Sequence, residues 1–295
     1  MSITRRSFLT RSAQAAALAA ASSSLAPLLA APAARGFKIG ACDWSLGKRC
    51  DPAAFDVAKQ IGLDGVQIEM GTVGNDMHLR KPEVQQRYED VCKRTGLEVA
   101  SLALGEFNSV PVKSDPRAAA WLADSIDVCK AMGLRIVMPA FFGRGDLDMS
   151  HTAEIDRVVQ VLRDVAVKAE PAGVTIGIEN YLSADDNRRI LDRVGSPAVK
   201  VYYDVGNSTD KGRDILKEIR SLGRLICEFH AKDAGHMLGQ GRIDFAKVRK
   251  AMDDVDYRGW IQIEAAHPHG LIPDYTAHCK YLKGIFPVNC QTEKR

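Results

Sequence analysis

The sequence predicts a single (β/α)₈ barrel, in which eight parallel strands are each followed by a helix. Short β-branched and apolar runs alternate regularly with amphipathic stretches of helical period. Glycines stand where six of the helices should end, directly before a new strand. No long polar linker interrupts the alternation, so the eight units should close into one barrel.

The elements can be placed by residue number. The expected strands are 37–44, 65–70, 98–104, 135–141, 174–180, 200–204, 225–230 and 260–265. The expected helices are 52–61, 82–94, 116–132, 152–169, 185–194, 213–222, 244–254 and 275–286. Asp51-Pro52 and Asp115-Pro116 are typical helix starts, with a capping carboxylate before a proline at the first position. The glycines expected to end helices are Gly62, Gly96, Gly133, Gly173, Gly195 and Gly223.

A doubly wound open sheet is the alternative fold. It would need a glycine-rich phosphate loop after the first strand. Ala41-Cys42-Asp43-Trp44 stands there instead, so the closed barrel is favoured. We place this domain at residues 36–290.

Residues 1–33 are expected to be a cleavable twin-arginine signal peptide. Arg5-Arg6 precede Phe8-Leu9, an uncharged alanine-rich run follows, and Ala31-Pro32-Ala33 offers small residues at a cleavage site. A membrane anchor is the alternative, but the run is weakly hydrophobic and interrupted by serine and proline. The expected partner is therefore the twin-arginine export machinery, and the expected location is periplasmic or otherwise exported.

Composition excludes several classes of protein. Removing 33 of the 295 residues leaves about 262, which suits one barrel of roughly 250 residues. Part of the net charge of +3 lies in that segment, and no basic stripe remains to bind nucleic acid. None of the seven cysteines forms a CxxC pair. The sequence leaves it undecided whether Cys42 and Cys50 form a disulfide. The sequence also leaves it undecided whether the protein forms a homo-oligomer.

Four side chains of metal-ligand type end four consecutive strands, namely Glu179, Asp204, His230 and Glu264. Side chains alternate along a strand, so a polar terminal residue among apolar neighbours should point into the barrel mouth, where such barrels carry their chemistry. Three converging carboxylates would repel one another unless a cation neutralised them. The sequence therefore predicts one divalent metal ion, for which oxygen-rich ligands with one imidazole suit Mn²⁺ or Mg²⁺ and admit Co²⁺ or Zn²⁺.

The motifs around these residues resemble those of the sugar phosphate isomerase/epimerase family, within the xylose isomerase-like TIM barrel superfamily. The superfamily also holds ketose 3-epimerases, inosose dehydratases and endonuclease IV. The resemblance covers the whole expected barrel but specifies no substrate. The motifs are Ile178-Glu179-Asn180, Tyr203-Asp204-Val205-Gly206-Asn207, His230-Ala231-Lys232-Asp233, Gly239-Gln240-Gly241-Arg242-Ile243-Asp244-Phe245 and Ile263-Glu264.

The resemblance implies roles for the four residues. In the ketose 3-epimerases such a set binds one Mn²⁺ or a similar ion, and the two glutamates exchange protons with the substrate. Glu179 and Glu264 would then be catalytic acid and base as well as ligands, acting through a metal-stabilised enediolate, while Asp204 and His230 would be ligands only. Asn207 departs from the histidine of those epimerases, and it also removes a histidine that endonuclease IV needs.

Six further polar residues are candidates for binding the substrate, each with a structural alternative. Lys232 would otherwise form a salt bridge to Asp233 or Glu264, and Arg242 would fix its own loop. Strand-end acids and lone loop histidines are often surface residues. The candidates are Glu69, His78, Asn207, Lys232, Arg242 and His267. His267 is expected to contact a ligand residue and not the metal ion itself. Glu106 and Asn108 share the ambiguity of Glu69, and Trp44, Phe107, Phe141 and Phe142 would either stack on a sugar or pack at the rim.

Three functions fit these predictions. The first is a metal-dependent sugar isomerase or epimerase acting on a small polyhydroxy or keto sugar. The second is a lyase or dehydratase acting on a 3-keto-glycoside with the same metal site, because proton abstraction beside a ketone needs the same groups. The third is a non-catalytic periplasmic sugar-binding barrel, which would not need three converging carboxylates.

Overall fold

The computed structural model describes residues 36–287, which form a closed barrel of eight parallel strands in sequence order. The barrel closes where β8 pairs with β1 in parallel, from Lys38 opposite Trp260 to Ala41 opposite Ile263. This confirms the predicted fold and excludes the open sheet. The strands are β1 (Lys38–Cys42), β2 (Gly65–Glu69), β3 (Glu98–Leu104), β4 (Ile136–Phe141), β5 (Thr175–Asn180), β6 (Val199–Asp204), β7 (Ile226–Ala231) and β8 (Trp260–Ile263).

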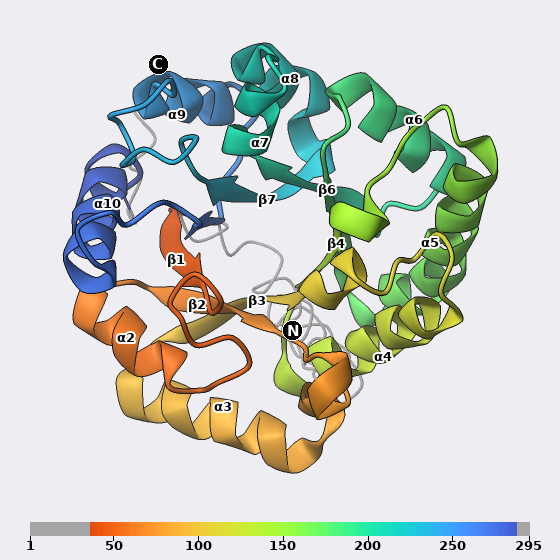
Figure 1. Cartoon of the computed structure of the whole chain (residues 1–295), viewed down its shortest axis with the longest axis horizontal. Helices are drawn as coiled ribbons and strands as arrows, with labels where there is room; N and C mark the ends of the chain where they lie inside the picture. The colour runs from red at the N-terminus through yellow and green to blue at the C-terminus, as the bar shows by residue number, and fades with distance from the viewer. Residues whose placement is uncertain (1–35, 288–295) are drawn as a thin grey trace, which may run out of the picture. The chain divides into compact units, whose positions relative to one another are not determined.

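The helices form a ring outside the strands (Figure 1). They are α2 (Ala54–Ile61), α3 (Pro82–Thr95), α4 (Pro116–Met132), α5 (Thr152–Ala172), α6 (Ala184–Val194), α7 (Val205–Asp210), α8 (Ile215–Leu222), α9 (Phe245–Asp254) and α10 (Leu271–Ile285). All six glycines predicted at helix ends have positive φ, the conformation for which glycine is suited. Asp115 caps α4 as predicted. The predicted start at Asp51-Pro52 is wrong, because α2 begins at Ala54 and Asp51 instead accepts a hydrogen bond from the backbone of Ala53.

The predicted signal peptide lies outside the described residues, as do residues 288–290 of the predicted domain. Among residues 36–287, no helix combines the length and apolar character needed to cross a bilayer. Cys42 and Cys50 are both free thiols, so the disulfide left open between them does not form. The reason is the direction of Cys42, whose Sγ points into the barrel and lies 3.2 Å from Oε1 of Gln67.

A buried carboxyl group lies inside the barrel, two residues before the predicted ligand His230. Glu228 is fully buried, and its Oε1 accepts hydrogen bonds from Ser101 (3.0 Å), Tyr202 (3.0 Å) and Gln262 (2.8 Å). Burial raises the pKa of Glu228, although these three donors partly offset it. The buried surroundings of Glu228 therefore favour the neutral form of its carboxyl group in the folded state.

Glu228→Gln is expected to change how stability depends on pH. Because the folded state holds the proton more tightly, the stability contributed by Glu228 is complete below the unfolded pKa, near 4.5, and is lost as pH rises through the higher folded pKa. Glutamine cannot lose a proton, so the free energy of unfolding of Glu228→Gln should rise relative to that of the unsubstituted protein as the pH increases above the unfolded pKa. Urea denaturation of both proteins in chelator measures this, and parallel pH profiles would contradict it.

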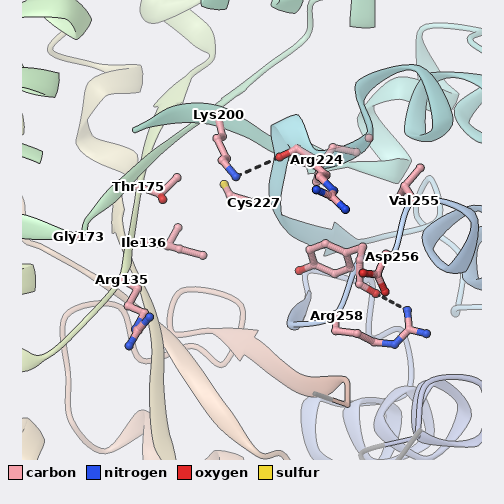
Figure 2. A pocket seen from close by; sticks show the side chains of 13 residues that line it. Arg135, Ile136, Gly173, Thr175, Lys200, Arg224, Cys227, Val255, Asp256 and Arg258 are labelled. Carbon is pink, nitrogen blue, oxygen red and sulfur yellow. Dashed lines mark hydrogen bonds between the residues drawn. The ribbon is translucent and has the colours of Figure 1, made fainter. Parts of the chain in front are cut away.

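A hollow lies at the amino-terminal ends of the strands, and Figure 2 shows the side chains that line it. It has a volume of about 430 Å³, and its lining includes Arg135, Lys200, Arg224 and Arg258. Two of these cations already have partners, since Lys200 donates to the backbone oxygen of Arg224 and Arg258 pairs with Asp253 at 2.9 Å. None of the four predicted metal ligands lines this hollow.

Candidate metal centre

The structure brings the four predicted ligands together at the carboxyl ends of β5 to β8. One ligand atom from each of Glu179, Asp204, His230 and Glu264 lies within 4.8 Å of all the others. Nδ1 of His230 is 2.8 Å from Oε1 of Glu179, 3.7 Å from Oε2 of Glu264 and 4.0 Å from Oδ2 of Asp204. Glu179, Asp204 and His230 are buried, whereas the side chain of Glu264 is one-quarter exposed. Glu264 therefore forms the open side of this cluster of four ligands, which we call the metal cage.

Asp204 is oriented by a helix that the sequence analysis did not predict. It is the N-cap of α7, and its Oδ1 accepts hydrogen bonds from the backbone N–H groups of Gly206 (2.7 Å) and Asn207 (2.9 Å). An aspartate is well suited to satisfy free N–H groups at a helix start. With Oδ1 occupied in this way, Oδ2 faces the other three ligands.

His230 is oriented by residues of neighbouring strands. Its Nε2 donates to Oε1 of Gln67 at 2.8 Å, which leaves Nδ1 directed at Glu179. The Tyr202 ring packs against the imidazole with centroids 4.6 Å apart. Gln67 was not singled out from the sequence. Its position two residues before Glu69 in β2 was the available indication, because both side chains then face the barrel interior.

The two glutamates have different partners. Oε1 of Glu264 accepts a hydrogen bond from Nε1 of Trp44 at 3.0 Å, and its Oε2 lies 2.6 Å from Nζ of Lys232. Glu179 instead contacts His230. Trp44 thus serves as a hydrogen-bond donor at the pocket, a role that the prediction of sugar stacking did not include.

Lys232 bridges two of the ligands. Its Nζ lies 2.9 Å from Oδ2 of Asp204 and 2.6 Å from Oε2 of Glu264. The predicted alternative of a salt bridge is therefore right for Glu264 and wrong for Asp233, whose carboxylate accepts backbone hydrogen bonds from the following loop. A Cβ at Gly206 would overlap Cγ of Lys232, so a glycine is needed for the lysine stem to reach the cage.

The electrostatics of the cage favour a divalent cation. Burial raises the pKa of Glu179, against the effect of His230, and raises that of Asp204, against the effect of Lys232. For Glu264, burial is outweighed by His230 and Lys232, so its pKa is lowered. Burial likewise opposes the charge on His230, but Glu179 and Cys42 raise its pKa well above the ordinary value. Three carboxylates with one imidazole form a donor set that fits a metal ion such as Mn²⁺.

Lys232→Met is expected to tighten Mn²⁺ binding by about tenfold or more, because the ammonium and the ion repel each other within one set of carboxylates. Methionine keeps an unbranched stem beside Gly206. Calorimetric titration of the metal-free proteins with Mn²⁺ measures the change, and Lys247→Met, at an exposed position, is the matched control. Weaker binding in Lys232→Met would show that the lysine holds the carboxylates in place for the ion.

A pocket of about 290 Å³ opens beside the cage. Its lining is Trp44, Arg49, Glu69, Gly105, Asn108, Met138, Ala140, Phe142, Glu179 and Glu264. Of the aromatic candidates, Trp44 and Phe142 line the pocket, whereas Phe107 and Phe141 are buried in the core. Arg49 was not singled out from the sequence, because nothing in a loop arginine indicates which wall it faces.

The candidate substrate residues divide into two groups. Glu69 lines the pocket, Lys232 contacts two ligands, and Asn207 lies 3.4 Å from Nζ of Lys232. Of the six candidates, Glu69 alone lines the pocket, and His78, Arg242 and His267 also lie apart from the metal cage. His78 is half-buried in a 3₁₀ turn (His78–Arg80), Arg242 forms an ion pair with Asp210, and the exposed His267 packs near the Tyr275 ring at 6.0 Å. Arg242 thus ties its loop to the end of α7, as its structural alternative predicted.

The fold and the ligand set together define a (β/α)₈ barrel protein with a candidate divalent-metal centre. The chain belongs to the family described as xylose isomerase-like TIM barrel, whose model matches residues 55–284.

Several relatives of this chain are sugar epimerases. It is 25% identical over 178 residues to 2-epi-5-epi-valiolone 7-phosphate 2-epimerase of Actinoplanes sp., covering 60% of this chain and 65% of that protein. It is 24% identical over 160 residues to D-psicose 3-epimerase of Ruminiclostridium cellulolyticum, covering 50% of this chain and 55% of the relative. The chain therefore spans less than two thirds of either relative.

Solved structures share the fold. D-psicose 3-epimerase from Clostridium cellulolyticum H10, solved with D-tagatose, has a TM-score of 0.73 at 17% identity and covers 86% of this chain and 100% of that one. D-allulose 3-epimerase from Methylomonas sp., in complex with D-allulose, has a TM-score of 0.68 at 18% identity. The match covers 85% of this chain and 98% of that one. At these identities the likeness establishes the barrel fold.

Proposed function

We propose that the protein is a metal-dependent epimerase or isomerase of a small polyhydroxy or keto sugar. The observation that carries the proposal is that Glu179 and Glu264, from strands separated by β6 and β7, line the same pocket and belong to the same candidate metal cage. Epimerisation beside a carbonyl needs a base on one face of the carbon and a proton donor on the other. Two carboxyl groups that come from different strand ends and line one pocket are suited to act as this pair.

The different surroundings of Glu264 and Glu179 give the two carboxyl groups different roles in proton transfer. The Glu264 carboxylate is stabilised by His230 and Lys232, which lower its pKa, so it stays ionised and acts as the base in one direction. Burial raises the pKa of Glu179 against the effect of His230, which suits this carboxyl group to exchange a proton with the opposite face. In the reverse direction the roles exchange. Lys232 keeps the charge of the cage balanced while protons move.

A bound Mn²⁺ or similar ion would be held by Glu179, Asp204, His230 and Glu264, and it would supply electrostatic stabilisation of negative charge on the substrate oxygens. Asp204 and His230 serve only to hold it, since α7 and Gln67 occupy their other polar atoms. Asn207 can hydrogen-bond a hydroxyl group but cannot move a proton.

Incubation with Mn²⁺ and a panel of ketoses in D₂O tests the proposal. We expect deuterium to enter the carbon beside the carbonyl of at least one sugar, together with its epimer or isomer. Cleavage of a 3-keto-glucoside without deuterium in any recovered sugar would support the lyase instead. A protein purified without metal, with a melting temperature that Mn²⁺ and Zn²⁺ leave unchanged, would support the non-catalytic binding barrel.

We also propose that the protein is exported through the twin-arginine route, on the basis of Arg5-Arg6 and the alanine-rich run that follows. Fractionation of cells expressing the full chain, beside the variant with both arginines changed to lysine, tests this. Retention of the variant inside the cell and export of the original are expected. Equal distribution of the two would contradict it.

A further inference from the structure

The wall of the pocket away from the metal cage carries one cation, and this cation is already paired. Nη2 of Arg49 lies 3.3 Å from Oε2 of Glu69 and 3.3 Å from Oε2 of Glu106. Glu69 is buried at the end of β2, where its Oε1 also accepts a hydrogen bond from the backbone N–H of Gly105 at 2.9 Å. Arg49 is therefore clamped between two carboxyl groups.

Three further hydrogen-bond donors on this side are also engaged. The backbone N–H of Gly105 donates to Glu69, and that of Phe142 donates to Oδ1 of Asn108 at 2.9 Å. Nε1 of Trp44 donates to Glu264. Backbone N–H groups of loops are common phosphate ligands, and here they are taken by side chains. The NH₂ group of Asn108 remains as a neutral donor, suited to a hydroxyl group.

The charges around the pocket are already paired, and this favours an uncharged group over a phosphate group. At the cage, three carboxylates are balanced by Lys232 and a divalent ion. On the far wall, the single charge of Arg49 is paired with Glu106, which lies behind it, and with Glu69, whose pKa burial raises to about 8. A phosphate group entering there would lose its water, meet no unpaired cation and lie near Glu106, so its desolvation would go uncompensated. A hydroxyl group can accept a hydrogen bond from the NH₂ group of Asn108, which lines the pocket. Met138, Ala140 and Phe142 offer apolar surface for the C–H faces of a sugar.

We propose that this pocket takes an uncharged polyhydroxy substrate and excludes its phosphorylated counterpart, and that Glu106 sets this specificity by holding Arg49. The inference rests on the proposed function and narrows its substrate class. The relatives leave the question open, because one is an epimerase of a 7-phosphate and another of D-psicose.

Matched sugars test the inference on the full chain loaded with Mn²⁺. Binding is measured by calorimetry for D-fructose against D-fructose 6-phosphate and for D-ribulose against D-ribulose 5-phosphate, with deuterium exchange followed in parallel. For at least one pair, the free sugar should bind at least about tenfold more tightly than its phosphate. Titration of metal-free protein with the same phosphates separates binding to the pocket from binding to the ion.

The matched variant is Glu106→Gln, which frees Arg49 from one partner and should reduce the preference by about tenfold. Glu98→Gln, at the amino-terminal end of β3, is the control and should leave the preference unchanged. Equal or tighter binding of the phosphates by the original protein would overturn the inference. If those phosphates also exchange deuterium, the proposed epimerase function stands. A preference that persists in Glu106→Gln would overturn the role of Glu106. If neither the free sugar nor its phosphate binds in any pair, the substrate class is overturned.

Discussion

Glu264→Gln is expected to lower the rate of proton exchange with the substrate by about 10²- to 10⁴-fold, the usual contribution of a positioned acid or base. Glutamine keeps the shape of the side chain, and its oxygen can still accept the hydrogen bond from Trp44. It cannot take a proton from carbon. The loss should therefore appear in kcat, measured as deuterium incorporation per enzyme molecule at saturating sugar and Mn²⁺.

Two measurements separate this loss from loss of the metal. Metal content of the variant should be determined at the Mn²⁺ concentration of the assay, because Glu264 is also a predicted ligand. Glu98→Gln makes the same chemical change at the other end of the barrel and should leave kcat unchanged. If Glu264→Gln retained full exchange while carrying the ion, Glu264 would be a ligand only, and the base would have to be sought elsewhere in the pocket.

The sequence predicted the barrel and the four clustered strand-end residues for the same reason. Strand periodicity determines which side chains face the interior, and the last polar residue of a parallel strand must lie at the carboxyl edge of the barrel. Glu179, Asp204, His230 and Glu264 follow from that rule alone. Helix ends marked by glycine were equally predictable, because they depend on local backbone conformation.

Contacts between distant segments were not predictable in this way. Arg49 and Glu106 come from two strand–helix connections and Glu69 from the end of β2, and only the loop conformations bring them together. The bridge from Lys232 to both Asp204 and Glu264 depends on the absence of a Cβ at Gly206, twenty-six residues earlier in the sequence. Helix α7 was missed because its sequence, Val-Gly-Asn-Ser-Thr-Asp, has low helix propensity. The cap provided by Asp204 stabilises its start.

His230→Ala is expected to be the most destabilising change at the site. The imidazole is fully buried, and its removal leaves the buried Glu179 without the partner 2.8 Å away and leaves a cavity beside Tyr202. Breaking a buried ion pair by deleting one member costs about 3–5 kcal/mol. For a domain of this size the melting temperature should fall by roughly 10 °C. Addition of Mn²⁺ should raise the melting temperature of the original protein but not that of the variant.

The source of this cost can be isolated with a second substitution. If the unpaired carboxylate dominates, Glu179→Gln in the His230→Ala background should recover part of the lost stability, although Glu179→Gln alone should destabilise the original protein. His151→Ala, at an exposed position beside α5, controls for the loss of a histidine and should have little effect. Additive effects of the two changes at the site would instead assign the cost to the cavity. The contact between Glu179 and His230 would then contribute little to holding the cage together before an ion binds.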